Sequence, residues 1–473
     1  MASPAQDKAS KSSAIPRKTS RRVTWGRLSL GVVAVLVYCI PQFEITRNAL
    51  NSVITSRVNQ FVPFDGIADS LGLSSLGGHS SGKNPCNSRL SAWIEDEAAL
   101  SWKKIFEQTG PAAGALEGFV IASPSTKDPD YLYTWTRDSA IVTSAILEKL
   151  LRTGDTALEA SLRLYAYSQK SLQRVCNPSG CFENGMHGLG EPKYNVDGTA
   201  FTGPWGRPQR DGPALRAITL VGFADYLLQR GTPQDIAFVK EHLYASDMPA
   251  ESVIKADLEY VARYWKEHSF DLWEEIDGHH FFTYIASLRA LSGGAALATK
   301  LGDTNAAAFY SAQATQIEED LHSFVSMKNG VVLAYKEPKQ FNRTGLDAAV
   351  PLGVLVSGAQ GASDWGPASD HILATLKAYV DSFRDEYKIN KGEKKLAVAT
   401  GRYAEDVYDG IGVSIGNPWY LTTLSVSHAI ARALQYYTST QSPIWINHIN
   451  KPFWAQFDDK IHSGEVLTHK DKR

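Results

Sequence analysis

The feature that most constrains the fold is a succession of segments in which apolar residues recur every three or four positions. This spacing is typical of helices with one buried face. No convincing run of alternating strand residues separates the segments, and heptad repeats are absent, so the sequence predicts an all-α toroid of helical hairpins rather than a coiled coil. We expect helices over residues 89–109, 137–153, 156–175, 211–230, 252–268, 279–300, 304–325, 345–357, 367–386, 417–438 and 443–457.

The first 86 residues differ in composition from the rest of the chain. Residues 1–27 are rich in Ser, Lys and Arg, and we expect them to be disordered. The apolar run 28–45 follows these basic residues and predicts a signal anchor or a cleaved signal peptide. We favour the anchor, because no small-residue cleavage site is obvious after the run. A flexible linker over 46–86, a folded domain over 87–460 and a charged tail over 461–473 are expected to follow.

An N-terminal targeting segment predicts the secretory pathway, with the protein either membrane-anchored or secreted. Vacuole and cell surface both remain open as destinations. The sequon Asn342-Arg-Thr is a glycosylation acceptor only in that pathway. The formal net charge of -2 gives no broad attraction to nucleic acid, so we expect no nucleic-acid partner.

The chain has four cysteines, which are too few for a disulfide-rich scaffold. Cys39 lies in the apolar run and is expected to be unpaired. Cys176 and Cys181 flank Asn-Pro-Ser-Gly and could close that loop with a disulfide, although spacing alone does not decide it. No His/Cys pair lies near enough to complete a zinc site, so no metal is expected.

An acidic pair, Glu274 and Glu275, directly follows Trp273 in a loop between two predicted helices. A carboxyl group beside an indole is partly desolvated, which favours its protonated form and suits it to general-acid catalysis. The alternative is a helix cap beside a solvated charge. His279 and His280, which follow closely, are interpreted as structural, because adjacent histidines at a helix start point apart.

Three further loops combine Trp, Arg and carboxylates. The first spans 128–139, where Arg137 and Asp138 open a predicted helix and Tyr131 and Trp135 could line a sugar site; an Asp that caps the helix is the alternative.

The second loop, 188–212, is rich in Gly and Pro and contains Trp205 and Arg207. Ordered loops of this length are usually functional. In the third loop, 401–419, Arg402 could form an internal salt-bridge cluster with Glu405 and Asp406.

Five motifs in these loops together resemble those of fungal glucoamylases, the family 15 glycoside hydrolases that release glucose from starch and glycogen with inversion. The motifs are Tyr-Thr-Trp-Thr-Arg-Asp-Ser, Gly-Glu-Pro-Lys-Tyr-Asn-Val-Asp, Trp-Gly-Arg-Pro-Gln-Arg-Asp-Gly-Pro-Ala-Leu-Arg, Leu-Trp-Glu-Glu and Gly-Asn-Pro-Trp. They occur in the family's order, and the resemblance extends over roughly residues 87–437. It implies an (α/α)6 barrel, an α-glucan substrate, no cofactor and a monomeric enzyme.

The resemblance also implies roles for individual residues. Glu274 resembles the general acid, and Glu275 resembles its neighbour that hydrogen-bonds the sugar on the leaving side. Arg137 and Asp138 match residues that hold the terminal glucose. The other positions match the aromatic lining or further support of the site: Tyr131, Trp135, Trp205, Arg207, Leu272, Arg402, Asp406 and Trp419.

One part of the family pattern is not found. An inverting enzyme needs a second carboxylate as general base, and the family's base segment precedes its last helix. The late carboxylates Asp458, Asp459 and Glu465 lack that context, and the chain is expected to end about one helical pair early. The sequence therefore predicts a glucan exo-hydrolase or, alternatively, an impaired or inactive glucan-binding chain. A helical scaffold for protein partners would explain none of the four loops.

Overall fold

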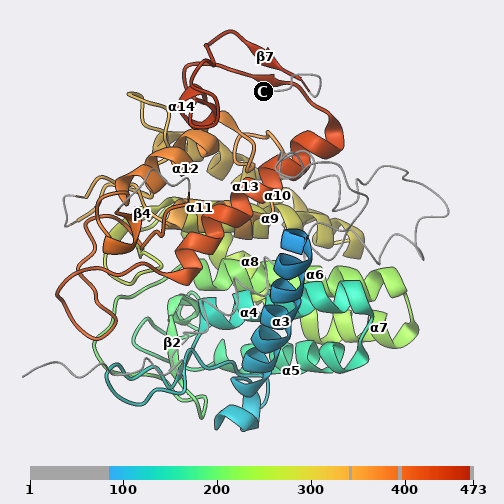
Figure 1. Ribbon diagram of the computed structural model, residues 1–473. Helices are drawn as coiled ribbons and strands as arrows, with labels where there is room; N and C mark the ends of the chain where they lie inside the picture. The colour runs from blue at the N-terminus through green and yellow to red at the C-terminus, as the bar shows by residue number, and fades with distance from the viewer. Residues whose placement is uncertain (1–84, 340–342, 392–396, 469–473) are drawn as a thin grey trace, which may run out of the picture.

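A computed structural model describes residues 85–339, 343–391 and 397–468 (Figure 1). The expected N-terminal tail and signal segment, and the expected linker up to residue 84, precede Pro85, and Asn342 of the sequon falls in a gap, so these predictions lie outside the described residues. The last two residues of the expected linker begin helix α3 (Pro85–Glu107) instead.

Helices dominate the described part of the chain, as the apolar spacing predicts. The longer ones begin and end close to the expected positions. They are α3 (Pro85–Glu107), α4 (Thr136–Thr153), α5 (Thr156–Leu172), α6 (Asp211–Arg230), α8 (Val253–Tyr264), α9 (Phe281–Leu301), α10 (Thr304–Leu321), α11 (Ala349–Ser357), α12 (Asp370–Ser382) and α13 (Tyr420–Thr440). Shorter segments are η3 (Gly110–Ala113), η4 (His187–Gly190), α7 (Pro233–Phe238), η5 (Val239–Leu243), η6 (His322–Phe324), η7 (Lys388–Asn390) and α14 (Lys451–Trp454).

The helices are arranged as successive hairpins. Helices α4, α6, α9, α11 and α13 form an inner series in which each packs against the next, while α5, α8 and α10 pack against this series as the outer helices. One large apolar cluster fills the space between the inner and outer helices. This inner-outer alternation is the arrangement expected for a toroid of helical hairpins.

Tight turns between helices follow from two Gly-Asp pairs. Gly154 (φ 67°) ends α4 and Gly302 (φ 81°) ends α9, both in the left-handed conformation that glycine adopts without strain. The next residue in each case caps the following helix: the side chains of Asp155 and Asp303 accept hydrogen bonds from the backbone N–H groups of Ala157 and Ala306.

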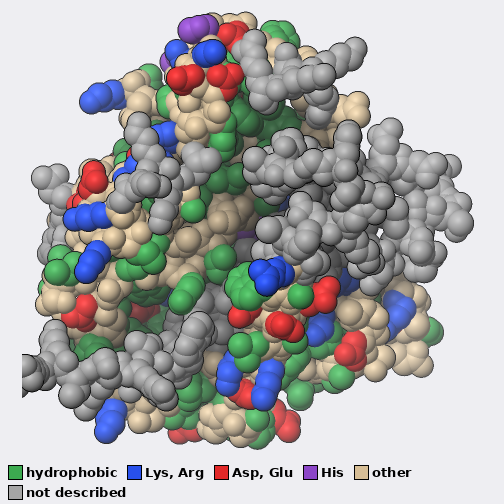
Figure 2. Space-filling view, in the orientation of Figure 1, with side chains coloured by type: hydrophobic (Ala, Val, Ile, Leu, Met, Phe, Trp, Pro, Cys, Tyr) green, Lys and Arg blue, Asp and Glu red, His purple; other side chains and the backbone are tan. Residues whose placement is uncertain are grey.

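Helix α9 is the centre of the core and packs against α6, α8, α10 and α11. By length and composition it is the helix among the described residues that could cross a membrane, but 72% of the apolar window is buried inside the protein. This burial is typical of a core helix. On the face shown in Figure 2, Lys and Arg side chains lie among Asp and Glu side chains, which fits a net charge near zero.

The described strands are short, antiparallel and confined to the connections between helices. β1 (Tyr133–Trp135) pairs with β2 (Lys193–Asn195), and β6 (Ile444–Trp445) pairs with β7 (Val466–Leu467). β4 (Asp277–His280) lies between β3 (Ser269–Phe270) and β5 (Tyr335–Lys336).

Two predictions from the apolar spacing were wrong. The acidic pair lies between helices α8 and α9, as predicted, in the turn of the β3–β4 hairpin, but His279 and His280 belong to β4 rather than to a helix start. Residues 443–457 contain β6 and the four-residue α14 instead of one helix. Pro452 explains this second error, because it would lie in the interior of the predicted helix, whereas proline is tolerated only in the first turn.

The predicted charged tail is also partly folded. Leu467 pairs with Ile444, and Ile461 is buried in a small apolar cluster with Phe453 and Trp454. The folded part therefore extends at least to β7, beyond the expected boundary at residue 460. Asp458 accepts a hydrogen bond from the backbone of Lys460 and has a local role in a turn.

Candidate active site

The four Trp-Arg-carboxylate loops meet at the N-terminal ends of the inner helices. Arg137 lies in the first turn of α4, and Trp419 directly precedes α13. The acidic pair is in the loop before β4, which leads directly into α9. The N-terminal ends of helices carry partial positive charge, so a cluster of such ends is a favourable place for carboxylates and for sugar oxygens.

Glu274 is held from several loops at once. Its Oε1 atom accepts hydrogen bonds from Trp135 Nε1 at 2.7 Å and from Gln209 Nε2 at 2.9 Å, and Arg137 Nη2 lies 3.7 Å away. Within the described residues, these contacts all involve Oε1, which leaves Oε2 to face a ligand. The backbone of Glu274 is in the left-handed region (φ 67°), which is uncommon for a residue other than glycine and often occurs at functional sites.

Glu275 has a different environment from that of its neighbour. Its Oε1 lies 2.9 Å from Arg402 Nη2, and its Oε2 accepts hydrogen bonds from Arg343 Nη2 at 2.9 Å and Tyr403 Oη at 2.6 Å. Two guanidinium groups and a hydroxyl therefore hold both oxygens of this carboxyl group. The arrangement therefore suits Glu275 to hydrogen bonding rather than to proton donation.

Arg137 and Asp138 border the same space. Arg137 Nη1 donates to Gln209 Oε1 at 2.8 Å and to Asp211 Oδ2 at 2.9 Å, which fixes the guanidinium group. Its Nε lies 3.9 Å from Asp138, whose side chain remains 27% exposed. Enclosure by the surrounding loops raises the pKa of the Asp138 carboxyl to about 6, against the opposing effect of Arg137.

An aromatic wall stands next to Glu274. The ring of Trp135 makes edge contacts with Tyr131 and Trp205, with centroid distances of 6.0 Å in both cases. The hydroxyl of Tyr131 is hydrogen-bonded to that of Tyr408 at 2.7 Å. Flat aromatic faces suit the C–H faces of sugar rings.

Lys193 supports this wall from within. Its Nζ lies 3.7 Å from the ring centroid of Trp205 and 4.7 Å from that of Trp135, and the rings of Tyr133 and Phe201 also surround it. Burial lowers the pKa of the Lys193 amine to about 8.

The 401–419 loop contacts the site at Glu275, through Arg402, and at Tyr131, through Tyr408. Arg402 forms the predicted salt bridge with Asp406 through two hydrogen bonds of 2.7 and 2.6 Å, and both side chains are buried. Trp419 makes an edge contact with Trp273 at a centroid distance of 5.9 Å. Trp273 Nε1 in turn donates to Asp347 Oδ1 at 2.8 Å, which joins this loop to the acidic pair.

Two predicted residues lie in the surrounding structure rather than among the converging polar groups. Arg207 donates from Nε to both carboxylate oxygens of Glu191, at 2.8 and 2.9 Å, and from its other nitrogens to the carbonyls of Phe201 and Gly203. These bonds fix the conformation of the 188–212 loop. The side chain of Leu272 is half-buried against the main apolar cluster.

The sequence reasoning missed several residues that complete the site. Gln209 and Lys193 lie inside motifs that carry the resemblance, but a neutral amide and a lone lysine gave no signal of their role. The contacts of Arg343, Asp347 and Tyr403 with the acidic pair or with Trp273 depend on the tertiary structure. Their sequence positions alone give no indication of these contacts.

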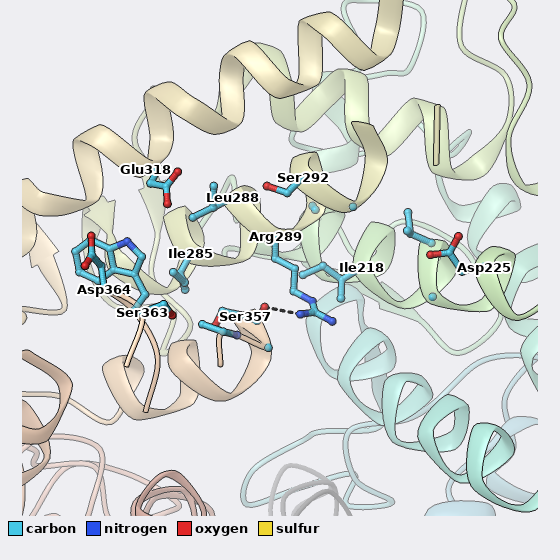
Figure 3. A pocket seen from close by; sticks show the side chains of 17 residues that line it. Ile218, Asp225, Ile285, Leu288, Arg289, Ser292, Glu318, Ser357, Ser363 and Asp364 are labelled. Carbon is cyan, nitrogen blue, oxygen red and sulfur yellow. Dashed lines mark hydrogen bonds between the residues drawn. The ribbon is translucent and has the colours of Figure 1, made fainter. Parts of the chain in front are cut away.

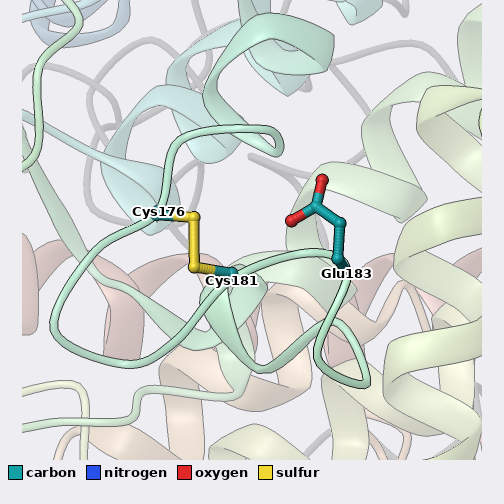
Figure 4. Close-up of side chains that lie close together, drawn as sticks. All are labelled: Cys176, Cys181 and Glu183. Atoms are coloured by element: carbon teal, nitrogen blue, oxygen red, sulfur yellow. A yellow bond between two sulfur atoms is a disulfide. The ribbon is translucent and has the colours of Figure 1, made fainter.

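The predicted cysteine pair forms a disulfide. Cys176 and Cys181 are bonded, and Glu183 lies close by (Figure 4). Because each sulfur is already bonded to the other, the group is not a thiolate metal site. The disulfide closes the loop that precedes η4 and the 188–212 segment.

A separate cavity of about 710 Å³ lies between α6, α9, α11 and the segment after α11 (Figure 3). Arg289 extends along it and donates a 2.6 Å hydrogen bond to the carbonyl of Ser357. None of the predicted site residues lines this cavity. It is therefore distinct from the cluster around Glu274.

Comparisons with known proteins agree with the motifs. Residues 100–472 match the family described as Glycosyl hydrolases family 15. Glucoamylase-1 of Schizophyllum commune is 39% identical over 407 residues, which are 84% of this chain and 66% of that protein. The probable glucoamylase of Schizosaccharomyces pombe is 38% identical over 382 residues, which are 80% of this chain and 79% of that protein.

Solved structures give the same result for the fold. The family 15 glucoamylase from Hypocrea jecorina superposes with a TM-score of 0.73 at 36% identity, over 80% of this chain and 62% of that one. The glucoamylase of Hormoconis resinae gives a TM-score of 0.72 at 37% identity, over 81% and 63%. These neighbours confirm the predicted (α/α)6 barrel class. The chain spans slightly less than two thirds of the length of several of these relatives.

Proposed function

The chain belongs to glycosyl hydrolase family 15, and on this basis we propose that it releases glucose from the non-reducing ends of α-1,4-glucans with inversion. The observation that carries the proposal is the pair of carboxyl groups, Glu274 and Glu275, in two different environments beside an aromatic wall. Adjacent carboxyls with different environments can take different chemical roles. Starch, glycogen and maltooligosaccharides share the chemistry that this site would recognise.

In the proposed reaction, Glu274 is the general acid. The donors from Trp135 and Gln209 fix Oε1, so that a proton on Oε2 can pass to the glycosidic oxygen as the bond to the leaving sugar breaks. Positioning of this kind matters because proton transfer needs heavy-atom distances of roughly 2.6–3.2 Å.

Binding of the terminal glucose is assigned to the other groups of the site. Arg137 and Asp138 would hold its outer hydroxyls, with Tyr131, Trp135, Trp205 and Trp419 as the aromatic lining. Glu275 would accept a hydrogen bond from the sugar on the leaving side. Arg207, Leu272, Arg402 and Asp406 would support these groups rather than contact the reacting atoms.

Inversion also requires a carboxylate that activates water on the opposite face of the sugar, about 6.5–9.5 Å from the acid. Among the late carboxylates, Asp458 and Glu465 accept hydrogen bonds from nearby backbone N–H groups in the α14–β7 region. We assign the base to none of the described residues. The stereochemistry of the product is therefore the sharpest test of the proposal.

The experiment measures glucose release from maltotriose by the full chain, with Glu274→Gln as the inactive variant and Glu319→Gln as a matched control. Glu319 is exposed on α10, outside the site. We expect β-glucose, seen by NMR as it forms, and a loss of about 100-fold or more in kcat for Glu274→Gln only. Full activity in Glu274→Gln would refute the assignment of the acid. Maltotriose binding without turnover by the unmodified chain would favour the glucan-binding alternative.

The proposal extends to location. The disulfide between Cys176 and Cys181 suits an oxidising compartment, as does the sequon at Asn342. We place the chain in the secretory pathway, either secreted or anchored through residues 28–45. Detection of the glycosylated chain in a membrane pellet that resists carbonate extraction would support the anchor, whereas recovery from the medium would support secretion.

A further inference from the structure

We propose that His268, His279 and Glu337 form a binding site for one divalent transition-metal ion of the Zn²⁺ type. One ring nitrogen of each histidine and one carboxylate oxygen of Glu337 lie within 4.8 Å of one another. The proposal goes beyond the glycosidase function and does not depend on it. The site is separate from the hydrogen bonds of Glu274, but it lies on the hairpin that carries that residue.

The β3–β4–β5 sheet brings the three ligands together. Ser269 pairs with Gly278 and His279 pairs with Lys336, so His268, His279 and Glu337 are next to one another across the three strands. The ring centroids of the two histidines are 4.5 Å apart. Since one ligand comes from each strand or its end, a bound ion would link all three strands.

The surroundings of the His279 ring suit it to bind a metal ion. Its side chain is 11% exposed, so the ring is largely enclosed by the surrounding structure. Its Nε2 lies 3.6 Å from Glu337 Oε2.

The other ring nitrogen of His279 has an outer partner. Nδ1 lies 3.2 Å from the hydroxyl of Tyr284. When Nδ1 carries the proton and donates to this hydroxyl, the lone pair of His279 is on Nε2, facing Glu337. Such outer partners are typical of metal-binding histidines.

His268 has a comparable outer partner. Asp277 Oδ1 lies 3.4 Å from His268 Nδ1, and Asp277 Oδ2 forms a 2.5 Å ion pair with Lys339. The carboxylate favours the tautomer with its proton on Nδ1, which leaves Nε2 of His268 for a metal. The second nearby amine, that of Lys336, is engaged with Asp320 and Ser323, so neither lysine competes for the ligand atoms.

Glu337 supplies the anionic ligand, and its exposed side chain can move toward the two histidines when an ion binds. Ligands of tetrahedral zinc at bond lengths of 2.0–2.2 Å lie about 3.4 Å apart, so the three groups must move together by about 1 Å. The Glu337 side chain is 72% exposed and can make this movement. Its backbone is in the left-handed region (φ 50°), a strained conformation that is more common at ligand-binding sites.

The ligand set indicates the class of metal. Two imidazoles and one carboxylate suit Zn²⁺, Cu²⁺ or Ni²⁺, whereas Ca²⁺ and Mg²⁺ prefer oxygen ligands alone. Binding would stabilise β3 and β4, which flank the loop at 271–276, so the ion should raise the thermal stability of the catalytic hairpin.

The test uses the full, untagged chain with its free thiols blocked, titrated with Zn²⁺ alone in a competition assay with a chelating dye. We expect one Zn²⁺ per chain and an increase in Tm with Zn²⁺ but not with Ca²⁺. Cobalt binding should give the visible absorption of a tetrahedral Co²⁺ site. The double variant His268→Ala/His279→Ala should bind Zn²⁺ at least about tenfold more weakly.

Two further variants keep the test decisive if the double variant fails to fold. Glu337→Gln removes the anionic ligand at an exposed position and should also weaken binding by about tenfold. His322→Ala is the matched control. His322 is an exposed histidine that lies 3.7 Å from the Asp364 carboxylate, much as His279 lies 3.6 Å from Glu337. Equal Zn²⁺ affinity in the unmodified chain and Glu337→Gln, or no saturable binding at all, would overturn the proposal.

Discussion

The indole Nε1 of Trp135 donates a 2.7 Å hydrogen bond to Oε1 of Glu274, although 139 positions separate the two residues in the chain. This bond joins the loop before α4 to the hairpin before α9. It also connects the aromatic wall to the proposed general acid, so that the group that would contact the sugar ring also orients the group that would protonate the glycosidic oxygen.

Replacing Trp135 with Phe should reduce activity by removing this donor while keeping an aromatic ring. A hydrogen bond to a charged or ionisable group contributes about 1.5–3 kcal/mol, so we expect kcat/KM on maltotriose to fall about 10- to 100-fold. The control is Trp445→Phe, at a largely exposed position in β6. Unchanged kinetics in Trp135→Phe would show that the bond does not position Glu274 during catalysis.

Replacing Asp406 with Asn should destabilise the protein. The Arg402–Asp406 pair is buried, and the loss of one partner leaves a buried charge with poorer compensation. Since Arg402 also contacts Glu275, we expect the free energy of unfolding to fall by about 3 kcal/mol, the low end for such pairs. Urea unfolding measures it, with Asp364→Asn at an exposed position as the control. A loss no greater than that of the control would contradict this prediction.

Asp347 should make stability depend on pH. Burial raises the pKa of its carboxyl to about 7, from about 3.8 in the unfolded chain. The folded state therefore favours the protonated form. The resulting contribution to the free energy of unfolding is fully present below pH 4 and is lost as the pH rises through 7. The free energy of unfolding of the unmodified protein, relative to Asp347→Asn, should decrease between pH 5 and pH 8 and then stay constant. A constant difference over that range would show that the carboxyl is already ionised in the folded protein at pH 5.

Lys193 should also make stability depend on pH, but in a higher pH range than Asp347 does. Because burial lowers the pKa of its amine to about 8, the unfolded chain binds more protons than the folded one between pH 8 and 10.5. The unmodified protein should therefore gain stability relative to Lys193→Met as the pH rises from 8 to 9.5. The comparison cancels the titration of other groups. A constant difference would mean that the aromatic rings fully offset the cost of burying the charge.

Much of the fold follows from local chemistry. Helical apolar spacing predicted α4, α6 and α9 closely, because each of these helices buries one face in the common core. Gly-Asp pairs such as Gly154-Asp155 fixed where helices end and begin. Apolar spacing failed at residues 443–457, where Pro452 interrupts the predicted helix, and at His279 and His280, where the four-residue strand β4 is too short to show a period.

By itself, the sequence determined the helical class, the family motifs and the chemical groups available for catalysis, because residue types and spacing carry that information. Only the tertiary structure decided which groups meet. The roles suggested for Glu274 and Glu275 differ because two loops supply donors to one residue and two guanidinium groups surround the other. A carboxyl group takes its properties from neighbours that are distant in the chain, and their positions are set by the packing of the helices that carry them.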